Sequence, residues 1–188
     1  MALKGFVALL LLVLVGGLFQ FKTDPSCKPQ LLNLFGLNPT VRFVGKVAPD
    51  IAMKDLKTGK TVHLKDFRGK VVLLEFWASW CPDCLRQLPT LQKLYKDPAF
   101  KNKVQFLTVN IKDPQARNPA QLKAWLRARH YTFPVLLGGM DVLKVYNVRF
   151  LPTLLVLTSK GQVLQSSPEY HSETSVRKWL QQAIRLSN

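Results

Sequence analysis

The chain has 188 residues, 47% of them hydrophobic, and a formal net charge of +16. This length and apolar content suit one domain with a hydrophobic core, and the absence of repeats and low-complexity tracts excludes a solenoid or a disordered chain. The basic residues are scattered along the chain rather than clustered with aromatic residues, so the charge does not predict a nucleic-acid groove. We interpret it as a solvated basic surface, suited to an anionic envelope.

An apolar segment precedes the rest of the chain. Residues 5–21 carry no charge and lie between Lys4 and Lys22. The segment is longer than the apolar core of a usual signal peptide and slightly shorter than the ~20 residues of a typical membrane-spanning helix. We interpret residues 1–21 as an uncleaved signal anchor with its N-terminus in the cytoplasm. The alternative is cleavage at the small-residue site formed by Val15 and Gly17, which would yield a secreted protein.

The remaining chain divides into a linker and one domain. Prolines and asparagines interrupt residues 22–44, which predicts a linker, and strands then alternate with helices over residues 45–188. This alternation predicts an α/β sandwich with a mixed sheet. Apolar runs of β type predict strands at Val62–Leu64, Lys70–Trp77, Val104–Ile111, Phe133–Leu137, Leu154–Thr158 and Val163–Gln165. Helical spacing predicts helices at Cys84–Tyr95, Pro119–Arg129, Met140–Tyr146 and Ser172–Leu186. In the first of these the apolar stripe consists of Leu85, Leu88, Leu91 and Leu94.

Two of the three cysteines form a C-x-x-C motif. Cys81 follows the predicted strand and precedes the predicted helix, so its sulfur should lie at a helix N-terminus, where free N–H groups and the helix dipole stabilise a thiolate. Pro82 suits the first helical position because its missing N–H would have no partner there. Cys84, one turn along, should be more buried and should resolve the mixed disulfide that Cys81 forms. The negative Asp83 should oppose the thiolate slightly, which argues against a strongly oxidising protein.

Other readings of the cysteines are weaker. A structural zinc site would need a second ligand pair, and Cys27 and the three histidines are not paired at ligand spacing. A structural disulfide is the alternative in an oxidising compartment, but a strand-to-helix junction flanked by Trp80 and Pro82 is a poor place for one. We expect no metal and no cofactor. Cys27, in the linker, receives no role, because residues 24–26 lack the small apolar run that lipoprotein processing requires.

The stretch EFWASWCPDC resembles the active-site segment of the thioredoxin superfamily. From Val44 onward the chain resembles the TlpA/ResA-like branch of membrane-anchored thiol–disulfide oxidoreductases. The resemblance implies a thioredoxin-like three-layer sandwich with a central mixed sheet and an N-terminal β-hairpin extension. Pro89 matches the proline that kinks the active-site helix of thioredoxins. Leu151, Pro152 and Thr153 match the cis-proline loop, which faces both sulfurs and binds the substrate backbone.

Glu75 occupies the place of the buried acidic residue of thioredoxins. Burial in VVLLEFW would raise its pKa and suit it to accept a proton from Cys84. The alternative is a strand glutamate whose carboxylate reaches water. Some ResA-like reductases carry an acidic residue where this chain has Gln87. Acid–base chemistry would then fall on Glu75, and a role in cytochrome c maturation stays open.

The leading interpretation is a reductase of extracytoplasmic disulfides. Its partners would be disulfide-bonded or thiol-containing envelope proteins and a transmembrane electron donor. One alternative is a thiol peroxidase, because peroxiredoxins share the opening around APD and LKDFRGK, although they place a lone cysteine where this chain has WCPDC. Another is a copper-delivery factor, which would need C-x-x-x-C and a distal histidine such as His130. The motif does not set the direction of electron flow, since C-x-x-C proteins span roughly 150 mV.

Overall fold

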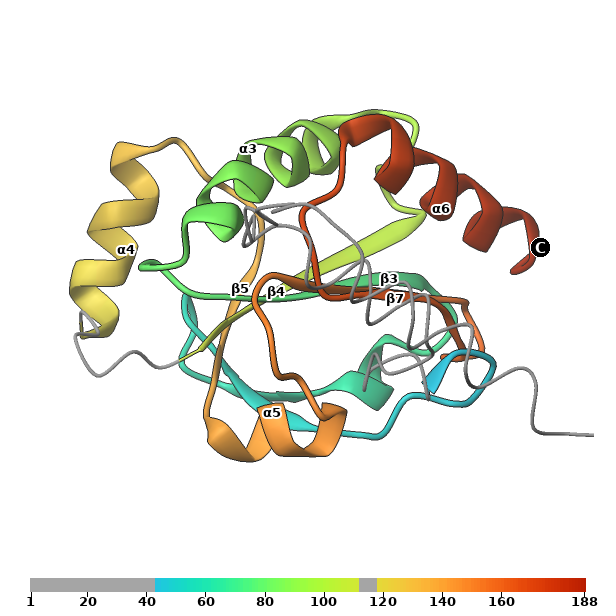
Figure 1. The fold of residues 1–188 in the computed structure, drawn as a ribbon, viewed down its shortest axis with the longest axis horizontal. Helices are drawn as coiled ribbons and strands as arrows, with labels where there is room; N and C mark the ends of the chain where they lie inside the picture. The colour runs from blue at the N-terminus through green and yellow to red at the C-terminus, as the bar shows by residue number, and fades with distance from the viewer. Residues whose placement is uncertain (1–42, 112–117) are drawn as a thin grey trace, which may run out of the picture.

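A seven-stranded mixed sheet forms the centre of the domain (Figure 1). The structure is a computed structural model that describes residues 43–111 and 118–188. The strand order across the sheet is β2-β1-β5-β4-β3-β6-β7. The strands are β1 (Ala52–Asp55), β2 (Thr61–His63), β3 (Val71–Trp77), β4 (Val104–Ile111), β5 (Val135–Gly138), β6 (Thr153–Leu157) and β7 (Val163–Ser167).

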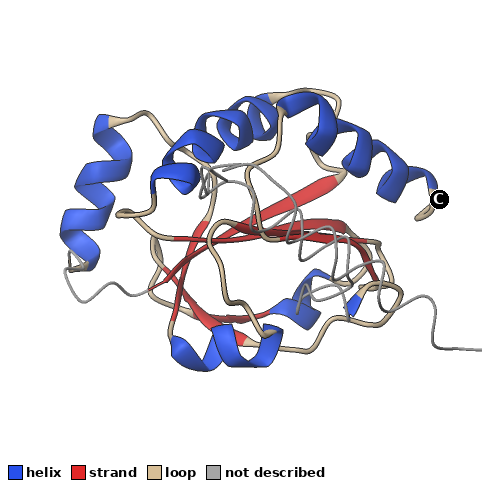
Figure 2. Cartoon of the chain, viewed as in Figure 1, coloured by secondary structure: helices blue, strands red, loops and turns tan. Residues whose placement is uncertain are grey.

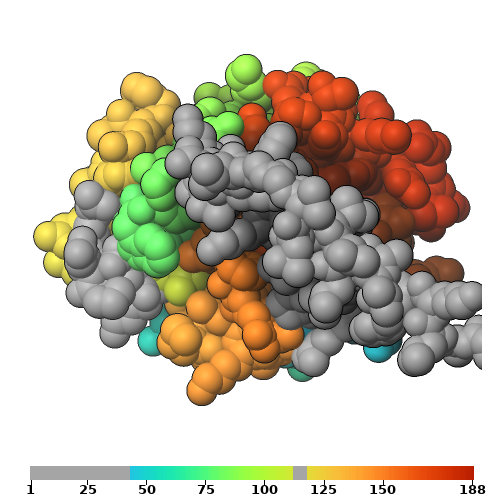
Figure 3. Space-filling model, viewed as in Figure 1, coloured from blue at the N-terminus to red at the C-terminus, as the bar shows by residue number. Residues whose placement is uncertain are grey.

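Helices cover both faces of this sheet and complete three layers (Figure 2). One face carries α3 (Pro82–Lys96), α4 (Pro119–Ala128) and α6 (Glu173–Arg185), and the other carries α5 (Met140–Tyr146) and the 3-10 helix η3 (Leu64–Phe67). In the space-filling view α4 and α6 lie at opposite ends of the molecule (Figure 3). The predicted α/β sandwich with a mixed sheet is therefore confirmed.

The boundaries of the predicted elements lie within two residues of the observed ones, and those of β4 and α5 match them. The apolar pattern of the sequence did not predict β1 or η3. It also predicted that the last strand ends at Gln165, whereas β7 continues to Ser167. β1 pairs antiparallel with both β2 and β5, so that β1 and β2 extend one edge of the sheet. β1 (Ala-Met-Lys-Asp) buries only Met53, so it lacks the apolar pattern by which the other strands are predicted.

β3 is buried on both faces because it lies between β4 and β6, parallel to the first and antiparallel to the second. Successive side chains of a strand point to opposite faces. Leu73 and Trp77 accordingly pack in the core layer under α3 and α6, and Leu74 and Phe76 pack in the other layer. The same alternation places Glu75 on the face that α3 covers.

Strand direction gives the domain two distinct ends. β3 and β4 begin at one end, and β6 finishes there because it runs antiparallel to β3. We call this the distal end. The described chain enters the domain there, where the N–H groups of Gly45 and Ala48 donate to the carbonyls of Val163 (2.8 Å) and Gly161 (2.9 Å). At the opposite, proximal end, β3 leads directly into α3.

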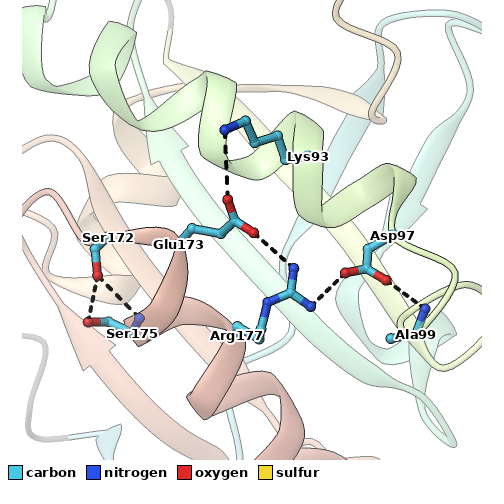
Figure 4. A network of polar contacts seen from close by, with 7 residues as sticks. All are labelled: Lys93, Asp97, Ala99, Ser172, Glu173, Ser175 and Arg177. Atoms are coloured by element: carbon cyan, nitrogen blue, oxygen red, sulfur yellow. Dashed lines mark hydrogen bonds and ion pairs between the residues drawn. The ribbon is translucent and has the colours of Figure 1, made fainter.

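A polar clamp joins the far end of α3 to the start of α6 (Figure 4). The guanidinium of Arg177 forms ion pairs with Asp97, 2.6 Å away, and with Glu173, 2.9 Å away. Lys93 approaches the second oxygen of Glu173 at 3.9 Å. The N–H of Ala99 and the Arg177 guanidinium lower the pKa of Asp97. The clamp therefore fixes two helices that lie side by side on one face of the sheet.

Several sequence predictions fall outside the described residues. These are the anchor at residues 1–21, Cys27 and most of the linker at residues 22–44. In the ranges that the structure describes, no helix is long and apolar enough to cross a membrane. At the end of the predicted linker, Phe43 is buried in the core and Val44 forms a β-bridge with Val163.

We predict that Arg177→Ala lowers the free energy of unfolding by on the order of 1 kcal/mol, because it removes both ion pairs of a partly exposed clamp. Since its partners lower the pKa of Asp97, the clamp should contribute fully above about pH 4 and lose its effect as the pH falls through the lowered pKa. Denaturant midpoints at neutral and acidic pH measure both effects. Lys178→Ala, at an exposed neighbouring position, is the control, and equal losses in both variants would contradict the prediction.

Candidate active site

Cys81 caps the N-terminus of α3. Its backbone is extended, and its Sγ accepts a hydrogen bond from the N–H of Cys84 at 3.2 Å. Pro82 is the first helical residue and has no N–H to satisfy. A disulfide joins Cys81 to Cys84. When this disulfide is reduced, the Cys81 sulfur lies where helix amides and the helix dipole stabilise a thiolate.

The two cysteines differ in their access to other molecules. Cys81 is 5% exposed and Cys84 is fully buried, in the order that the spacing predicts. The Cys81 Sγ also lies 3.4 Å from the carbonyl oxygen of Leu151, to which a Cys81 thiol can donate in the reduced protein. An incoming sulfur can therefore reach Cys81 more readily than Cys84.

The loop before β6 lies beside the Cys81 sulfur. The Leu151–Pro152 peptide bond is cis, as the resemblance implies. Pro152 and Thr153 are buried, and the Thr153 hydroxyl donates to the carbonyl of Phe150 at 2.6 Å. The structure thus brings residues 151–153 next to the cysteine pair, although 70 positions separate Cys81 from Leu151.

Three exposed apolar side chains flank these segments, and we call them the apolar collar: Trp80, Leu85 and Phe150. Trp80, just before Cys81, is 56% exposed. The sequence places Leu85 on the inner stripe of α3, and that prediction is wrong. The buried stripe runs through Cys84, Gln87, Leu88, Leu91 and Leu94, and Leu85 lies one position off it.

Charges at the start of α3 are mixed. Asp83 forms an exposed ion pair with Arg86 at 3.0 Å, and the Arg86 guanidinium lies over the ring of Tyr170, 4.6 Å from its centre. The ion pair offsets part of the negative charge that Asp83 places near Cys81. Its unfavourable effect on a Cys81 thiolate is therefore smaller than the sequence alone indicates.

Glu75 is the one fully buried acidic side chain among the described residues. Its cross-strand neighbours are Thr108 on β4 and Leu154 on β6, and neither carboxylate oxygen has a hydrogen-bond partner within the described ranges. Leu154 and Cys84 belong to the core layer that Glu75 faces. Burial raises the pKa of Glu75 well above its ordinary value. The alternative of a strand glutamate that reaches water is wrong.

Gln87 ties α3 to the segment before α6. Its side chain is buried, and its Oε1 accepts a hydrogen bond from the N–H of His171 at 2.7 Å. The His171 ring packs edge-on against Trp179, and burial lowers the pKa of His171 to about 4. Both side chains are therefore uncharged at neutral pH, and Glu75 is the buried acidic group on this face of the sheet among the described residues.

Copper delivery would require a third ligand beside the cysteines. His130 lies in the exposed turn after α4, with a left-handed backbone (φ 56°). Among residues 43–111 and 118–188, no three His, Cys, Asp or Glu side chains form a group that could hold a metal ion. The described part of the chain therefore offers no such copper site.

Comparison with known proteins identifies relatives of the whole domain. The model of the AhpC/TSA family matches residues 44–166. Thiol-disulfide oxidoreductase ResA of Geobacillus kaustophilus is 37% identical over 133 residues, 70% of this chain and 72% of that protein. Thioredoxin-like protein YneN of Bacillus subtilis is 34% identical over 142 residues, 76% of this chain and 79% of that protein.

A solved structure extends the comparison to the fold. The pneumococcal exposed lipoprotein thioredoxin Etrx1 from Streptococcus pneumoniae is 29% identical, and the alignment covers 71% of this chain and 99% of that one with a TM-score of 0.61. The similarity includes nearly all of the described domain. The cysteine pair and the neighbouring loop therefore lie in a fold that this relative shares.

We predict that Glu75→Gln stabilises the fold in a pH-dependent way. Because the pKa of Glu75 is raised in the folded state, the unfolded chain releases its proton at lower pH, and the buried carboxyl costs stability as the pH rises above about 4. The gain from the substitution should be small at acidic pH and grow by up to about 1.4 kcal/mol per pH unit until the raised pKa is reached. Denaturant midpoints over this range measure it, with Glu169→Gln as the control; a pH-independent difference would refute it.

Proposed function

This chain belongs to the AhpC/TSA family and is a thiol–disulfide oxidoreductase of ResA type, and on that premise we propose that it reduces disulfides of extracytoplasmic proteins. The observation that carries the proposal is the placement of the two sulfurs. Cys81, 5% exposed, lies at the N-terminus of α3, and Cys84, one turn further along the helix, is fully buried.

The reaction proceeds by two exchanges. The Cys81 thiolate attacks a substrate disulfide, the substrate S–S bond breaks, and a mixed disulfide forms between Cys81 and the substrate while a substrate thiolate leaves. Cys84 then attacks the Cys81 sulfur, which forms the intramolecular disulfide seen in the structure and releases the second substrate thiol. Two electrons pass to the substrate, and a dithiol donor must return them to the Cys81–Cys84 pair.

The second exchange needs Cys84 to lose a proton in a buried place. The Glu75 carboxylate faces the same core layer, and its raised pKa brings it closer to the pKa of a thiol. Glu75 therefore accepts the Cys84 proton as the thiolate attacks. A buried carboxyl that costs stability is consistent with such a role at an active site.

The surface around Cys81 favours a protein as the substrate. The residues of the apolar collar, Trp80, Leu85 and Phe150, are exposed and lie next in sequence to Cys81, Cys84 and Leu151. Exposed apolar groups that surround a reactive group indicate a contact surface for another macromolecule. A disulfide flanked by apolar side chains would bury them against this collar as its sulfur reaches Cys81.

The proposed location outside the cytoplasm rests on the sequence and on a relative. Residues 5–21 have the composition of a signal anchor, which would hold the domain at the outer face of the membrane. The related Etrx1 is described as an exposed lipoprotein thioredoxin. In this position the donor would be a transmembrane carrier that brings electrons from the cytoplasm.

We predict that Cys84→Ser accumulates mixed disulfides with envelope proteins, because the resolving thiol is lost while Cys81 still attacks. Non-reducing electrophoresis and mass spectrometry of the membrane fraction measure the trapped species. Cys81→Ser is the matched control and should trap none. Equal trapping by the two variants would contradict the assignment of roles.

For Glu75→Gln we further predict that the release of a disulfide-bonded protein substrate slows by at least about tenfold, because Cys84 loses its proton acceptor. Stability and rate should thus change in opposite directions. Single-turnover reduction at neutral pH measures the rate, and Glu169→Gln should react like the parent. An unchanged rate in Glu75→Gln would remove Glu75 from the mechanism.

A further inference from the structure

Five lysines gather at the distal end of the domain, and we call them the lysine cluster: Lys70, Lys96, Lys101, Lys103 and Lys160. Lys70 precedes β3, Lys101 and Lys103 precede β4, and Lys160 lies in the β6–β7 turn. Two adjoining hollows, of about 470 and 210 Å³, share Lys70 and Asn102 in their walls. Of the described residues, no Asp or Glu lines either hollow.

Among the described residues, the lysine cluster has no acidic partners. All five side chains are exposed, and none has an ion pair with another described residue. Lys96, in the last turn of α3, offsets the helix dipole. The other four lie in loops, where no dipole explains them. At the proximal end, by contrast, Arg86 pairs with Asp83.

Exposed apolar side chains accompany these lysines. Val47 is 56% exposed next to its bridge partner Gln162, and Leu186 is 59% exposed beside Ser187, whose hydroxyl accepts the N–H of Ser159. Val44 is exposed at the neighbouring bridge to Val163. Lysines interspersed with apolar residues are typical of surfaces that lie at the lipid–water interface.

The path of the chain suggests what these residues contact. The domain begins at its distal end, with residues 43–48 held against the β6–β7 turn, and α6 also finishes there (Figure 1). The predicted anchor and linker precede residue 43, so the distal end is the part of the domain tethered closest to the membrane. We infer that the lysine cluster docks onto the headgroups of anionic phospholipids in the membrane that holds the anchor.

This docking extends the proposed membrane attachment and orients the domain. Cys81 and the apolar collar lie at the proximal end, because β3 runs from the lysine cluster toward α3. With the distal end on the lipid surface, the reactive sulfur points away from the membrane. Attraction of several lysines to an anionic surface biases this orientation once the anchor holds the domain close to the membrane.

The test is lysine footprinting of the full chain in lipid nanodiscs. The protein is inserted into discs of phosphatidylcholine alone or with phosphatidylglycerol, and amine acetylation is followed residue by residue by mass spectrometry. We expect the lysine cluster to react about fivefold more slowly in the anionic discs. Lys54 on β1 and Lys144 on α5, exposed away from this end, should react equally in both. Raising the salt to about 1 M, which shortens the Debye length to about 3 Å, should abolish the protection.

Two double variants test the same inference further. Lys101→Gln with Lys103→Gln should reduce the protection of Lys70, whereas Lys54→Gln with Lys144→Gln should not. Equal acetylation in both kinds of disc would overturn the inference, and protection in phosphatidylcholine that grows with protein density would assign the surface to a second copy of the chain. Disulfide reduction measured in detergent is independent of docking, so its loss would count against the proposed function and not against this surface.

Discussion

The position of one sulfur atom, Cys81 Sγ at the N-terminus of α3, is the constraint on which the site depends. β3 must run through the centre of the sheet to deliver the chain there, and Pro82 must begin the helix without a surplus N–H. The Cys84 N–H then donates to the sulfur, and Cys84 itself becomes the buried partner. The fold thus gives the two cysteines different reactivity, because they differ in solvent exposure and because the dipole of α3 acts on Cys81.

Burial of Glu75 costs folding stability, in contrast to the burial of its apolar neighbours. The all-buried β3 provides the central core of the domain, yet it contains a carboxyl with no polar partner among the described residues. Burial of Leu73 and Trp77 on the same face stabilises the fold, whereas burial of the Glu75 carboxyl destabilises it. Such a group is consistent with selection for reactivity rather than stability. The site thus combines a reactive sulfur at Cys81 with an adjoining apolar collar that can contact a protein substrate.

Much of this arrangement could be predicted from the sequence, because the relevant signals are local. A continuous apolar run predicts β3, and the spacing of Cys81 and Cys84 predicts their placement on α3. Contacts between distant residues could not be predicted in this way. Gln87 meets His171 across 84 positions, and Asp97 meets Arg177 across 80. The exposure of Leu85 and Phe150 depends on the packing of other elements, so periodicity alone assigns Leu85 to the wrong face and says nothing of Phe150.

The most direct test of the account is the pH dependence of alkylation at each cysteine of the fully reduced protein, resolved by peptide mass spectrometry. If the α3 N-terminus stabilises the Cys81 thiolate, Cys81 should be alkylated first, with a midpoint below the value of about 8.5 that is usual for a free cysteine. Cys84 should react slowly across the same range because it is buried. Alkylation of Cys84 as fast as that of Cys81, or a Cys81 midpoint at or above the ordinary value, would contradict the central claim.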